Sequence, residues 1–490
     1  MTRHTQASAF PGRPQSTPDR VRWSAREWAM LAAVCGAFFL DALDNIMVGI
    51  ALPSIQAEFG MTAVTAQWVV SAYLLGFGGF LLLGGRLADQ VGRRRMFLFG
   101  VTLFAIGSVV AGAALNSEMA IGGRLLMGIG AAFTAPAALS IITSTFPAGQ
   151  ARNRALGIYT ACGAVGYTSG AIIGGLLAQI GWRWIYFLPL LPATLAFVGC
   201  LILVSKDLGV RHNKNYDVWG ALTGTFGILS LTYAIIEIPF RGISAPRATA
   251  ALACAVACLV VFVAVEKRVR DPLLDLRLLT HRNLVWAGLV AAAILGTYMS
   301  FQFIVTLYLQ STRGWSPLQM ALAFLPIGFL IMTIAPRMYW FIGRFGVNTM
   351  ITAGFVAYAL AYGNLLRIGP DSSYIWVILP SIVLIGFAFP FSFAPANVLA
   401  VTDIAERDHG VAAGILQSGY QLGAALVLAL TTVIMNGNTE RLEIAQYRNG
   451  LVGLLVISLA TILLSILFPR VRAQSKDSST TASELSHPQA

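Results

Sequence analysis

Long apolar stretches follow one another along almost the whole chain, and they constrain its fold more than any other feature. A helix needs about 20 mainly apolar residues to cross the hydrocarbon core of a membrane, and we count fourteen such stretches. They cover residues 28–50, 65–84, 97–115, 119–142, 155–178, 185–204, 218–238, 247–265, 284–309, 318–341, 348–367, 374–395, 410–434 and 449–468. Only 11% of the residues are charged whereas 57% are hydrophobic, a balance that an ordinary soluble core cannot bury. The sequence therefore predicts an all-α integral membrane protein with fourteen transmembrane helices.

The distribution of basic residues predicts which side of the membrane each loop faces. Lys and Arg are enriched in the cytoplasmic loops of membrane proteins. With the N-terminus inside, 25 of the 33 Lys and Arg lie in cytoplasmic segments, seven lie in outward loops, and Arg124 lies within a helix. The polar tails at residues 1–27 and 471–490 then both face the cytoplasm. We therefore expect a multi-pass protein of the cytoplasmic (inner) membrane.

Polar segments near the middle of the chain divide it into three parts. The stretch from Lys206 to Asp217 is polar, two apolar stretches follow, and a charged loop runs from Glu266 to Asp271. We expect a six-helix bundle at 28–204, a central linker with two extra transmembrane helices at 205–282, and a second six-helix bundle at 283–470.

The loop after the second apolar stretch carries a fixed pattern of glycine, acid and base. Its sequence, GRLADQVGRRR, begins at Gly85. Glycines let two helices approach each other, and a carboxylate among cations can bridge to neighbouring helices. A plain basic loop would not need Gly85, Asp89, Gly92, Arg93 and Arg94 at this spacing.

This pattern resembles the signature loop of the major facilitator superfamily, Gly-x-Leu-Ala-Asp-x-x-Gly-Arg-Arg, which lies at the same place in the chain. A shorter copy, GRFG at Gly343–Gly346, follows the tenth apolar stretch, where a second half should repeat the loop, and this copy lacks the acid. The resemblance implies two related six-helix halves and a conformational latch that only the first copy forms.

Three further stretches are similar to motifs of the fourteen-helix drug:proton antiporters of that superfamily. The first apolar stretch ends in LDNIMVGIALP, which begins at Leu43 and in which Ile46 and Gly49 replace the usual Thr and Asn. The fourth contains RLLMGIG, beginning at Arg124, which looks like the family's Arg-x-x-x-Gly-x-Gly element. The fifth contains GYTSGAIIGG, which resembles the antiporter motif with Ala171 in place of proline.

The glycines of the antiporter motif also indicate close helix packing, independently of the resemblance. They are Gly166, Gly170, Gly174 and Gly175. The first three recur every four residues, so they line one helix face and permit close contact with another helix. Packing alone would explain such a stripe as well as a role in transport does.

Two acids, Asp41 and Asp44, lie near the centre of the first predicted helix. A carboxylate in a membrane-spanning helix costs about 2.5 kcal/mol or more, so it usually faces a cavity and usually serves function. The two side chains share one helix face, and neighbouring carboxylates in a low dielectric resist joint ionisation. One of them should then bind a proton near neutral pH, as a proton carrier must. The family pattern contains only Asp44, so we expect Asp44 to carry the proton and keep Asp41 as the alternative.

Arg124 is the one basic residue deep in an apolar stretch. The resemblance implies that its charge tunes the proton affinity of the two aspartates. A static ion pair that orders the first and fourth helices is the alternative.

The apolar stretches of the second half offer neutral polar and aromatic side chains and no acid. A mostly apolar pocket with a few polar anchors suits drug-like ligands, although packing between helices would use the same residues. This composition favours neutral or singly charged amphiphiles as substrates. The candidate substrate cavity comprises Tyr298, Gln302, Phe387, Phe391, Gln417, Tyr420 and Gln421.

Several protein classes are excluded by what the sequence lacks. No Gly-x-x-x-x-Gly-Lys loop occurs, so the chain has no such site for ATP, and an ion gradient must supply the energy. All five histidines fall outside the apolar stretches, so we expect no catalytic residue, no metal site and no cofactor. The net charge of +12 is spread over short loops beside the membrane, which argues against a nucleic-acid partner.

The sequence thus predicts a proton-coupled secondary active exporter that works by alternating access. Its substrates would be small amphipathic organic compounds such as antibiotics or secondary metabolites. The alternatives are a facilitator or importer of a small nutrient with the same fold and, more remotely, a membrane-embedded enzyme or sensor. The expected partners are the substrate, protons, the lipid bilayer and, if the cell is Gram-negative, a periplasmic adaptor.

Overall fold

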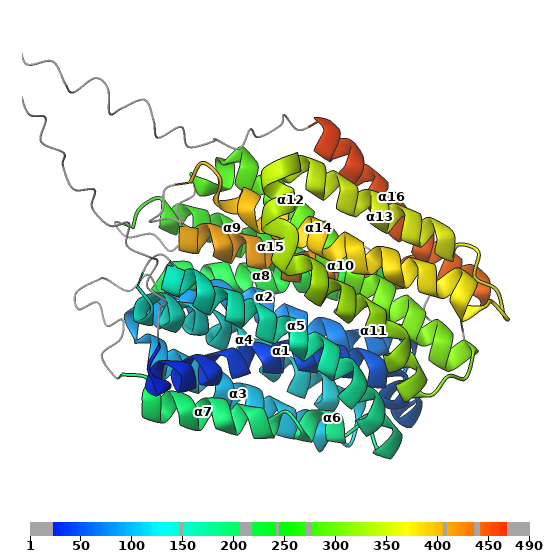
Figure 1. Cartoon of the computed structure of the whole chain (residues 1–490), viewed down its shortest axis with the longest axis horizontal. Coiled ribbons are helices and arrows are strands. Elements are labelled where there is room, and N and C mark those ends of the chain that lie inside the picture. Colours follow the sequence, from blue (N-terminus) through cyan, green and yellow to red (C-terminus); the bar gives the residue numbers. More distant parts are fainter. Residues whose placement is uncertain are drawn as a thin grey trace, which may run out of the picture.

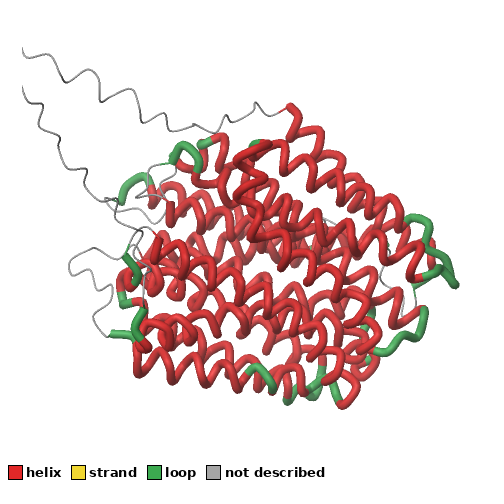
Figure 2. The backbone as a smooth tube through the Cα atoms, in the orientation of Figure 1, coloured by secondary structure: helices red, strands yellow, loops and turns green. Residues whose placement is uncertain are grey.

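The computed structural model describes residues 23–147, 150–205, 218–241, 245–269, 277–404, 409–435 and 442–467, and these residues form helices joined by short loops (Figure 2). No strand occurs among them. Most of the expected tail 1–27, all of the tail 471–490 and the polar segment 206–217 lie outside the described residues.

Side-chain caps fix where several helices of the first half begin. The Ser24 hydroxyl accepts from the backbone N–H of Glu27 at 3.2 Å, and the Glu27 carboxylate accepts from the Ser24 N–H at 2.7 Å, which is a capping box. Asn116 caps the fourth helix with its side chain alone, accepting from Met119 N at 2.8 Å. The helices of this half are α1 (Ala25–Phe59), α2 (Ala63–Gln90), α3 (Arg93–Gly112), α4 (Ser117–Thr145), α5 (Gln150–Ile180), α6 (Trp184–Phe187) and α7 (Leu190–Leu203).

The two inserted helices, α8 (Val218–Arg241) and α9 (Pro246–Glu266), pack against each other, and the second half follows them. Its helical segments are η1 (Leu278–Thr280), α10 (Arg282–Leu307), η2 (Tyr308–Thr312), α11 (Pro317–Ile334), η3 (Ala335–Arg337), α12 (Met338–Phe345), α13 (Val347–Leu365), η4 (Tyr374–Ile378), α14 (Leu379–Val401), α15 (His409–Ile434) and α16 (Ile444–Leu467). Figure 1 shows the first half and the second half as two bundles side by side.

Each of the fourteen predicted stretches overlaps one helix or consecutive helical segments. Within the described residues, ten helical segments are long and apolar enough to cross a membrane, so the chain is a multi-pass membrane protein, while the number fourteen stays a prediction. Two predicted helices are interrupted. The sixth divides into α6 and α7 near Pro189, and the tenth passes through the short turn η3 at Pro336, because proline lacks the N–H that continues a helix.

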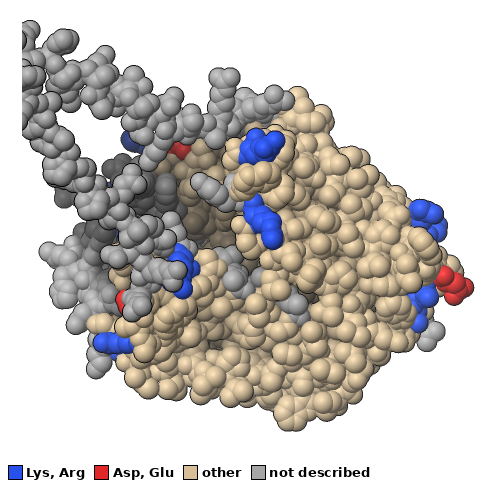
Figure 3. Space-filling view, viewed as in Figure 1, with Lys and Arg blue, Asp and Glu red and all other residues tan. Residues whose placement is uncertain are grey.

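The outer surface of the bundles is apolar over a broad belt. Leu195 of α7, Val260 of α9 and Leu459 of α16 are 66%, 63% and 51% exposed. In the space-filling view, the few charged side chains lie at the left, in the upper middle and at the right end, and a wide uncharged surface covers the lower right part of this face (Figure 3). Such a belt matches the hydrocarbon core of a bilayer.

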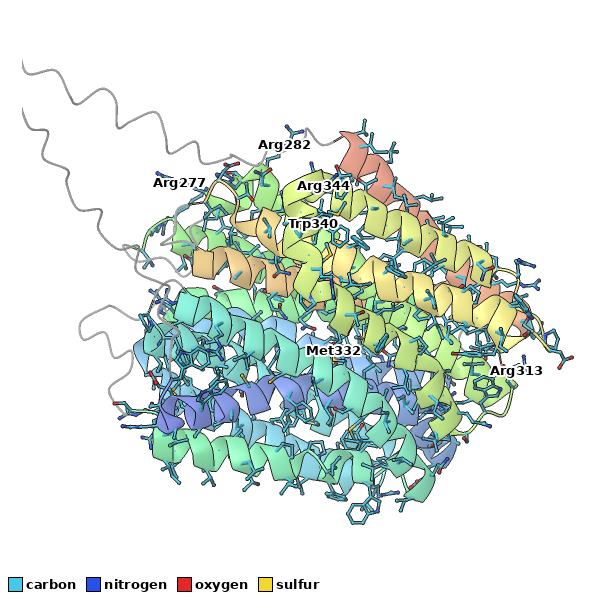
Figure 4. All side chains as sticks on the ribbon, in the orientation of Figure 1. Arg277, Arg282, Arg313, Met332, Trp340 and Arg344 are labelled. Carbon is cyan, nitrogen blue, oxygen red and sulfur yellow. The ribbon has the colours of Figure 1, made fainter. Side chains whose placement is uncertain are left out.

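We call the end of the molecule where α1 begins and α16 ends the tail face, and the opposite end the far face. At the tail face, Trp23 contacts Phe146 after α4, with ring centroids 4.8 Å apart. Arg277 and Arg344 lie toward this face, whereas Arg313 lies at the far face (Figure 4). The basic-residue pattern predicts that the tail face is cytoplasmic, and this orientation stays a prediction.

The two halves contact each other through α5 with α11 and through α2 with α15. Near the far face, a Cβ on Gly175 of α5 would lie 2.6 Å from Ala321 Cβ and 3.0 Å from Leu318 Cα of α11. The backbone carbonyl of Ile50 in α1 accepts from Gln310 Nε2 at 2.9 Å. These contacts bring the halves together tightly on the far side of the molecule.

Candidate functional site

A buried ion pair joins α1 to α4 near the centre of the first half. Arg124 Nη1 donates to Asp44 Oδ2, and the side chains of Arg124 and Asp44 are 1% and 0% exposed. Arg124 Nε also donates to the backbone carbonyl of Val69 in α2 at 3.0 Å. A buried charge needs such an opposite partner, because an isolated one would cost several kcal/mol. The other oxygen, Asp44 Oδ1, has no hydrogen-bond partner among the described residues.

Tyr73 of α2 connects this ion pair to the second carboxylate, and sequence reasoning missed it. The Arg124 guanidinium carbon lies 4.5 Å from the centroid of the Tyr73 ring, which is a cation–π contact. The Tyr73 hydroxyl donates to Asp41 Oδ1. The sequence offered only one indication of this contact: a tyrosine buried in an apolar stretch usually has a hydrogen-bond partner for its hydroxyl.

Asp41 has a different environment from Asp44. Its side chain is partly exposed, and its partners are neutral: the Tyr73 hydroxyl and the amide of Asn45, whose Nδ2 lies 3.5 Å from Asp41 Oδ1 and 2.8 Å from the Asp41 carbonyl. Tyr159 and Tyr167 of α5 lie within electrostatic range of Asp41. The structure therefore brings Asp41, Asp44 and Arg124 into one cluster, as expected, but pairs the cation with Asp44 alone.

Close contact between α2 and α4 positions Tyr73 against Arg124. A Cβ on Gly128 would lie 2.1 Å from the Tyr73 carbonyl oxygen, and one on Gly84 would lie 2.3 Å from the Ala132 carbonyl oxygen. Only glycine fits at such distances. Gly128 belongs to the Arg-x-x-x-Gly-x-Gly element that begins at Arg124, so this element provides both the cation and the space that lets α2 reach it.

The glycines of the antiporter motif pack α5 against α1, beside the charge cluster. A Cβ would lie 2.6 Å from Phe39 O at Gly166, 2.8 Å from Leu43 O at Gly170 and 2.9 Å from Met47 Cα at Gly174. The three glycines share one face, and that face meets the helix that carries both aspartates. The fourth, Gly175, instead meets α11 of the second half.

The loop between α2 and α3 lies at the tail face. Gly92 has a φ of 112°, which favours glycine. Arg93 Nη1 donates to Ser140 O of α4 at 3.0 Å, and Arg94 Nη2 donates to Leu201 O of α7 at 2.5 Å. Both arginines thus tie this loop to neighbouring helices of the same half. The side chain of Asp89 lies outside the described residues.

Two details of this loop were not visible in the sequence. A Cβ on Gly85 would lie 3.8 Å from Pro136, an ordinary contact, so Gly84 makes the close approach to α4 that we expected of Gly85. A step of one residue turns a side chain by about 100° around a helix. In the shorter copy, Gly346 has a φ of 83° and stands between α12 and α13 as Gly92 stands between α2 and α3.

A small cavity lies where the two halves meet. It has a volume of about 20 Å³ and is lined by Ile46 of α1, Tyr167 and Ala171 of α5, Tyr298 of α10 and residues of α11. Its volume suits roughly one water molecule, whereas sites for drug-sized ligands measure roughly 300–1,000 Å³. The cavity is therefore too small for a drug-sized organic compound.

Four aromatic rings form a continuous column through the second half. Tyr298 lies 5.3 Å from Phe389, Phe389 lies 5.2 Å from Phe393, and Phe393 lies 4.9 Å from Tyr420, measured between ring centroids. The Tyr420 hydroxyl accepts from Asn397 Nδ2 at 3.2 Å. The expected residues Tyr298 and Tyr420 thus belong to one arrangement.

The expected phenylalanines of α14 lie elsewhere. Phe387 is 39% exposed, and Phe391 contacts Phe341 of α12 with centroids 5.5 Å apart. Phe389 and Phe393 meet Tyr298 and Tyr420 in their place. Either pair, spaced four residues apart, shares a helix face, so the spacing alone could not tell which face of α14 turns toward α10.

Two of the three expected amides, Gln302 and Gln421, lie at the contact between the halves. Gln302 is 4% exposed, and a Cβ on Gly49 of α1 would lie 2.4 Å from its Nε2 atom. A Cβ on Gly78 of α2 would lie 3.2 Å from Gln421 Cβ, and Gln421 is 6% exposed. Gln417 is partly exposed. Gln302 and Gln421 therefore face the first half across the interface.

The family of the chain follows from comparison with known proteins. A family model described as Major Facilitator Superfamily matches residues 34–428. The chain belongs to this superfamily. The resemblance noted in the loop that begins at Gly85 is thereby confirmed, and the family is one of membrane transporters.

Relatives within the major facilitator superfamily match nearly the whole chain. The puromycin resistance protein pur8 of Streptomyces alboniger is 35% identical over 452 residues, which cover 90% of this chain and 87% of that protein. The cephamycin export protein CmcT of Amycolatopsis lactamdurans is 30% identical over 446 residues, 90% of this chain and 92% of that protein. A crystal structure of a POT family transporter in complex with a thioalcohol-conjugated peptide has a TM-score of 0.67 at 16% identity and covers 90% of this chain and 95% of that one, a likeness of fold.

Proposed function

We propose that this protein exports small amphipathic organic compounds, such as antibiotics or secondary metabolites, in exchange for protons. The observation that carries the proposal is the cluster of Asp41 with the buried Asp44–Arg124 ion pair inside the first half, in a chain whose relatives are named for antibiotic resistance and export. Intramembrane ionisable groups are costly and mark ion or proton pathways.

The chemistry of the cluster supports proton coupling. Two carboxylates and one guanidinium leave one unit of negative charge when all are ionised, and binding one proton neutralises it. A group that cycles between these two states can link a proton gradient to a conformational change. One proton moving across 100 mV gains about 2.3 kcal/mol, and each 1.4 kcal/mol is a tenfold factor, so this potential alone could sustain a gradient of roughly fifty-fold.

The contact between the halves supports alternating access. The cavity at Tyr167 and Tyr298 is too small for a substrate, while Gly175 and Gln310 bring the halves together near the far face. We propose that the tail face is cytoplasmic, that rocking of the two halves opens the cavity to each side in turn, and that both termini remain in the cytoplasm.

The second half supports a preference for neutral or singly charged compounds. The column from Tyr298 to Tyr420 supplies aromatic surface, and Gln302 and Gln421 supply neutral hydrogen-bonding groups. Aromatic and apolar walls with few polar anchors suit amphiphiles.

Transport by the purified protein in proteoliposomes tests the proposal. A neutral fluorescent amphiphile and a fluorescent dication of similar size are supplied with an imposed pH gradient, and a pH dye follows proton movement. We expect uphill movement of the neutral compound, coupled to opposite movement of protons. Movement of both in the same direction would indicate an importer, and transport of the dication alone would refute the proposed substrate class.

A further inference from the structure

The cluster in the first half has a charge balance that singles out one proton site. Asp41 and Asp44 are linked through Tyr73 and Arg124, so all four side chains share one low-dielectric region. With both acids ionised, one negative charge has no cation. A membrane interior penalises such a charge, so the cluster should hold one proton for part of the transport cycle. The question is which carboxylate holds it.

Asp41 and Asp44 differ in their contacts, and this difference indicates which of them holds the proton. Asp44 is 0% exposed and touches the Arg124 guanidinium directly, and an opposite charge in contact favours the ionised form. Among the described residues, Asp41 has only neutral hydrogen-bond partners, a phenol and an amide, and it retains some exposure. Protonating a carboxylate that has no cation partner costs less free energy, because no ion pair is lost. A proton carrier must also reach water to exchange its proton. Asp41 is partly exposed, whereas Asp44 is 0% exposed.

Tyr73 explains why the cation does not move between the two acids. The centroid of its ring lies 4.5 Å from the Arg124 guanidinium carbon, and its hydroxyl donates a hydrogen bond to Asp41 Oδ1. Arg124 is further held by the Val69 carbonyl at 3.0 Å. Tyr73 therefore stands between Arg124 and Asp41 and contacts both.

In the part of the chain that the structure describes, phenols are the other titratable groups found near Asp41. Tyr159 and Tyr167 of α5 are within electrostatic range of Asp41, and Tyr186 of α6 is within range of Arg124 and Asp44. Neutral phenols do not supply the missing positive charge. Asp44 therefore remains the carboxylate that is paired with a cation, and Asp41 the one that is not.

We propose that Asp41 is the carboxylate that takes up and releases the transported proton, while Asp44 stays ionised against Arg124 and Tyr73 keeps the two acids distinct. This inference rests on the proposed proton-coupled function. In each cycle a proton from water on one side forms an O–H bond at Asp41, and the same bond breaks when Asp41 is open to the other side. It reverses the expectation from the family pattern, which favoured Asp44.

Infrared difference spectra of the purified full-length protein between acid and alkaline pH test the assignment, because a protonated carboxyl group has its own carbonyl band. We expect Asp41→Asn to remove one titrating component of that band. Asp44→Asn alone would leave Arg124 without its partner, and the free cation would then favour ionised Asp41. The matched variant is therefore Asp44→Asn, Arg124→Gln, which removes both charges of the pair and should retain the component. Loss of the component in this double variant, or its persistence in Asp41→Asn, would overturn the proposal.

Tyr73 is a positioning residue, and its test uses the pH dependence of the same band. Tyr73→Phe keeps the ring under Arg124 but removes the hydrogen bond to ionised Asp41, so the protonated form should persist to a pH about one unit higher. Tyr186→Phe is the matched control, because the Tyr186 hydroxyl is buried and has no partner among the described residues. Equal spectra for Tyr73→Phe and native protein would refute the role of Tyr73.

Proteoliposome transport by the same variants separates this inference from the proposed function. If native protein moves substrate without protons, the proposed function fails whatever the spectra show. If native protein exchanges substrate for protons and Asp41→Asn does so too, only the assignment to Asp41 fails. We expect Asp41→Asn to lose proton exchange while it still binds substrate, because an amide resembles a protonated acid in shape.

Discussion

Replacing Gly128 with alanine should disturb the charge cluster without altering any charged residue. The new Cβ would lie 2.1 Å from the Tyr73 carbonyl oxygen and 3.0 Å from Tyr73 Cα. These are backbone atoms, which cannot rotate away, and ordinary contact begins at 3.4 Å. The helices α2 and α4 must therefore separate locally by roughly 1 Å, and overpacking of this kind costs about 1–3 kcal/mol.

The same separation should release Arg124 from α2. The hydrogen bond from Arg124 Nε to Val69 O is 3.0 Å long, and an increase of roughly 1 Å takes it beyond bonding range. Losing a hydrogen bond to a charged group costs about 1.5–3 kcal/mol. We expect Gly128→Ala to lower the apparent melting temperature by several degrees and to reduce transport, since both the guanidinium and Tyr73 move away from their positions beside the aspartates.

The control for this variant lies on the same helix. A Cβ on Gly122 would meet nothing within 4 Å, and alanine favours a helix over glycine by about 1 kcal/mol, so Gly122→Ala should be neutral or slightly stabilising. Melting curves in detergent and transport in proteoliposomes compare the two variants directly. If Gly128→Ala matched Gly122→Ala in both assays, the close packing of α2 on α4 and its role in holding Arg124 would be refuted.

Three further predictions concern the loop at the tail face and the contact between the halves. Asp89→Asn should slow transport while equilibrium substrate binding stays nearly unchanged, if the loop is the conformational latch that the resemblance implies; normal turnover would contradict this. Gly92→Ala should lower the melting temperature, since a φ of 112° strains an alanine by about 1–2 kcal/mol, whereas Gly122→Ala should not. Gly175→Leu should push α5 away from α11 and so raise the labelling of Leu318→Cys by an impermeant thiol reagent; unchanged labelling would show that Gly175 does not hold the halves together.

The sequence alone determined the class of protein and much of its organisation. Apolar stretches of membrane-spanning length identify helices because the hydrocarbon core demands that length of any chain. The pattern at Gly85 identified the superfamily, and the scarcity of buried charges made Asp41, Asp44 and Arg124 conspicuous. Each of these inferences depends on residue type and spacing along one helix or loop, which are local properties of the chain.

The tertiary structure decided which side chains meet. It paired Arg124 with Asp44, placed Tyr73 against Asp41, assigned the close approach to Gly84 and brought Phe389 to Tyr298. Candidates on one helix can differ by only one or two residues, and each residue turns the side chain by about 100°. The rotation of each helix about its axis results from packing against several neighbours at once, so no single stretch of sequence contains it.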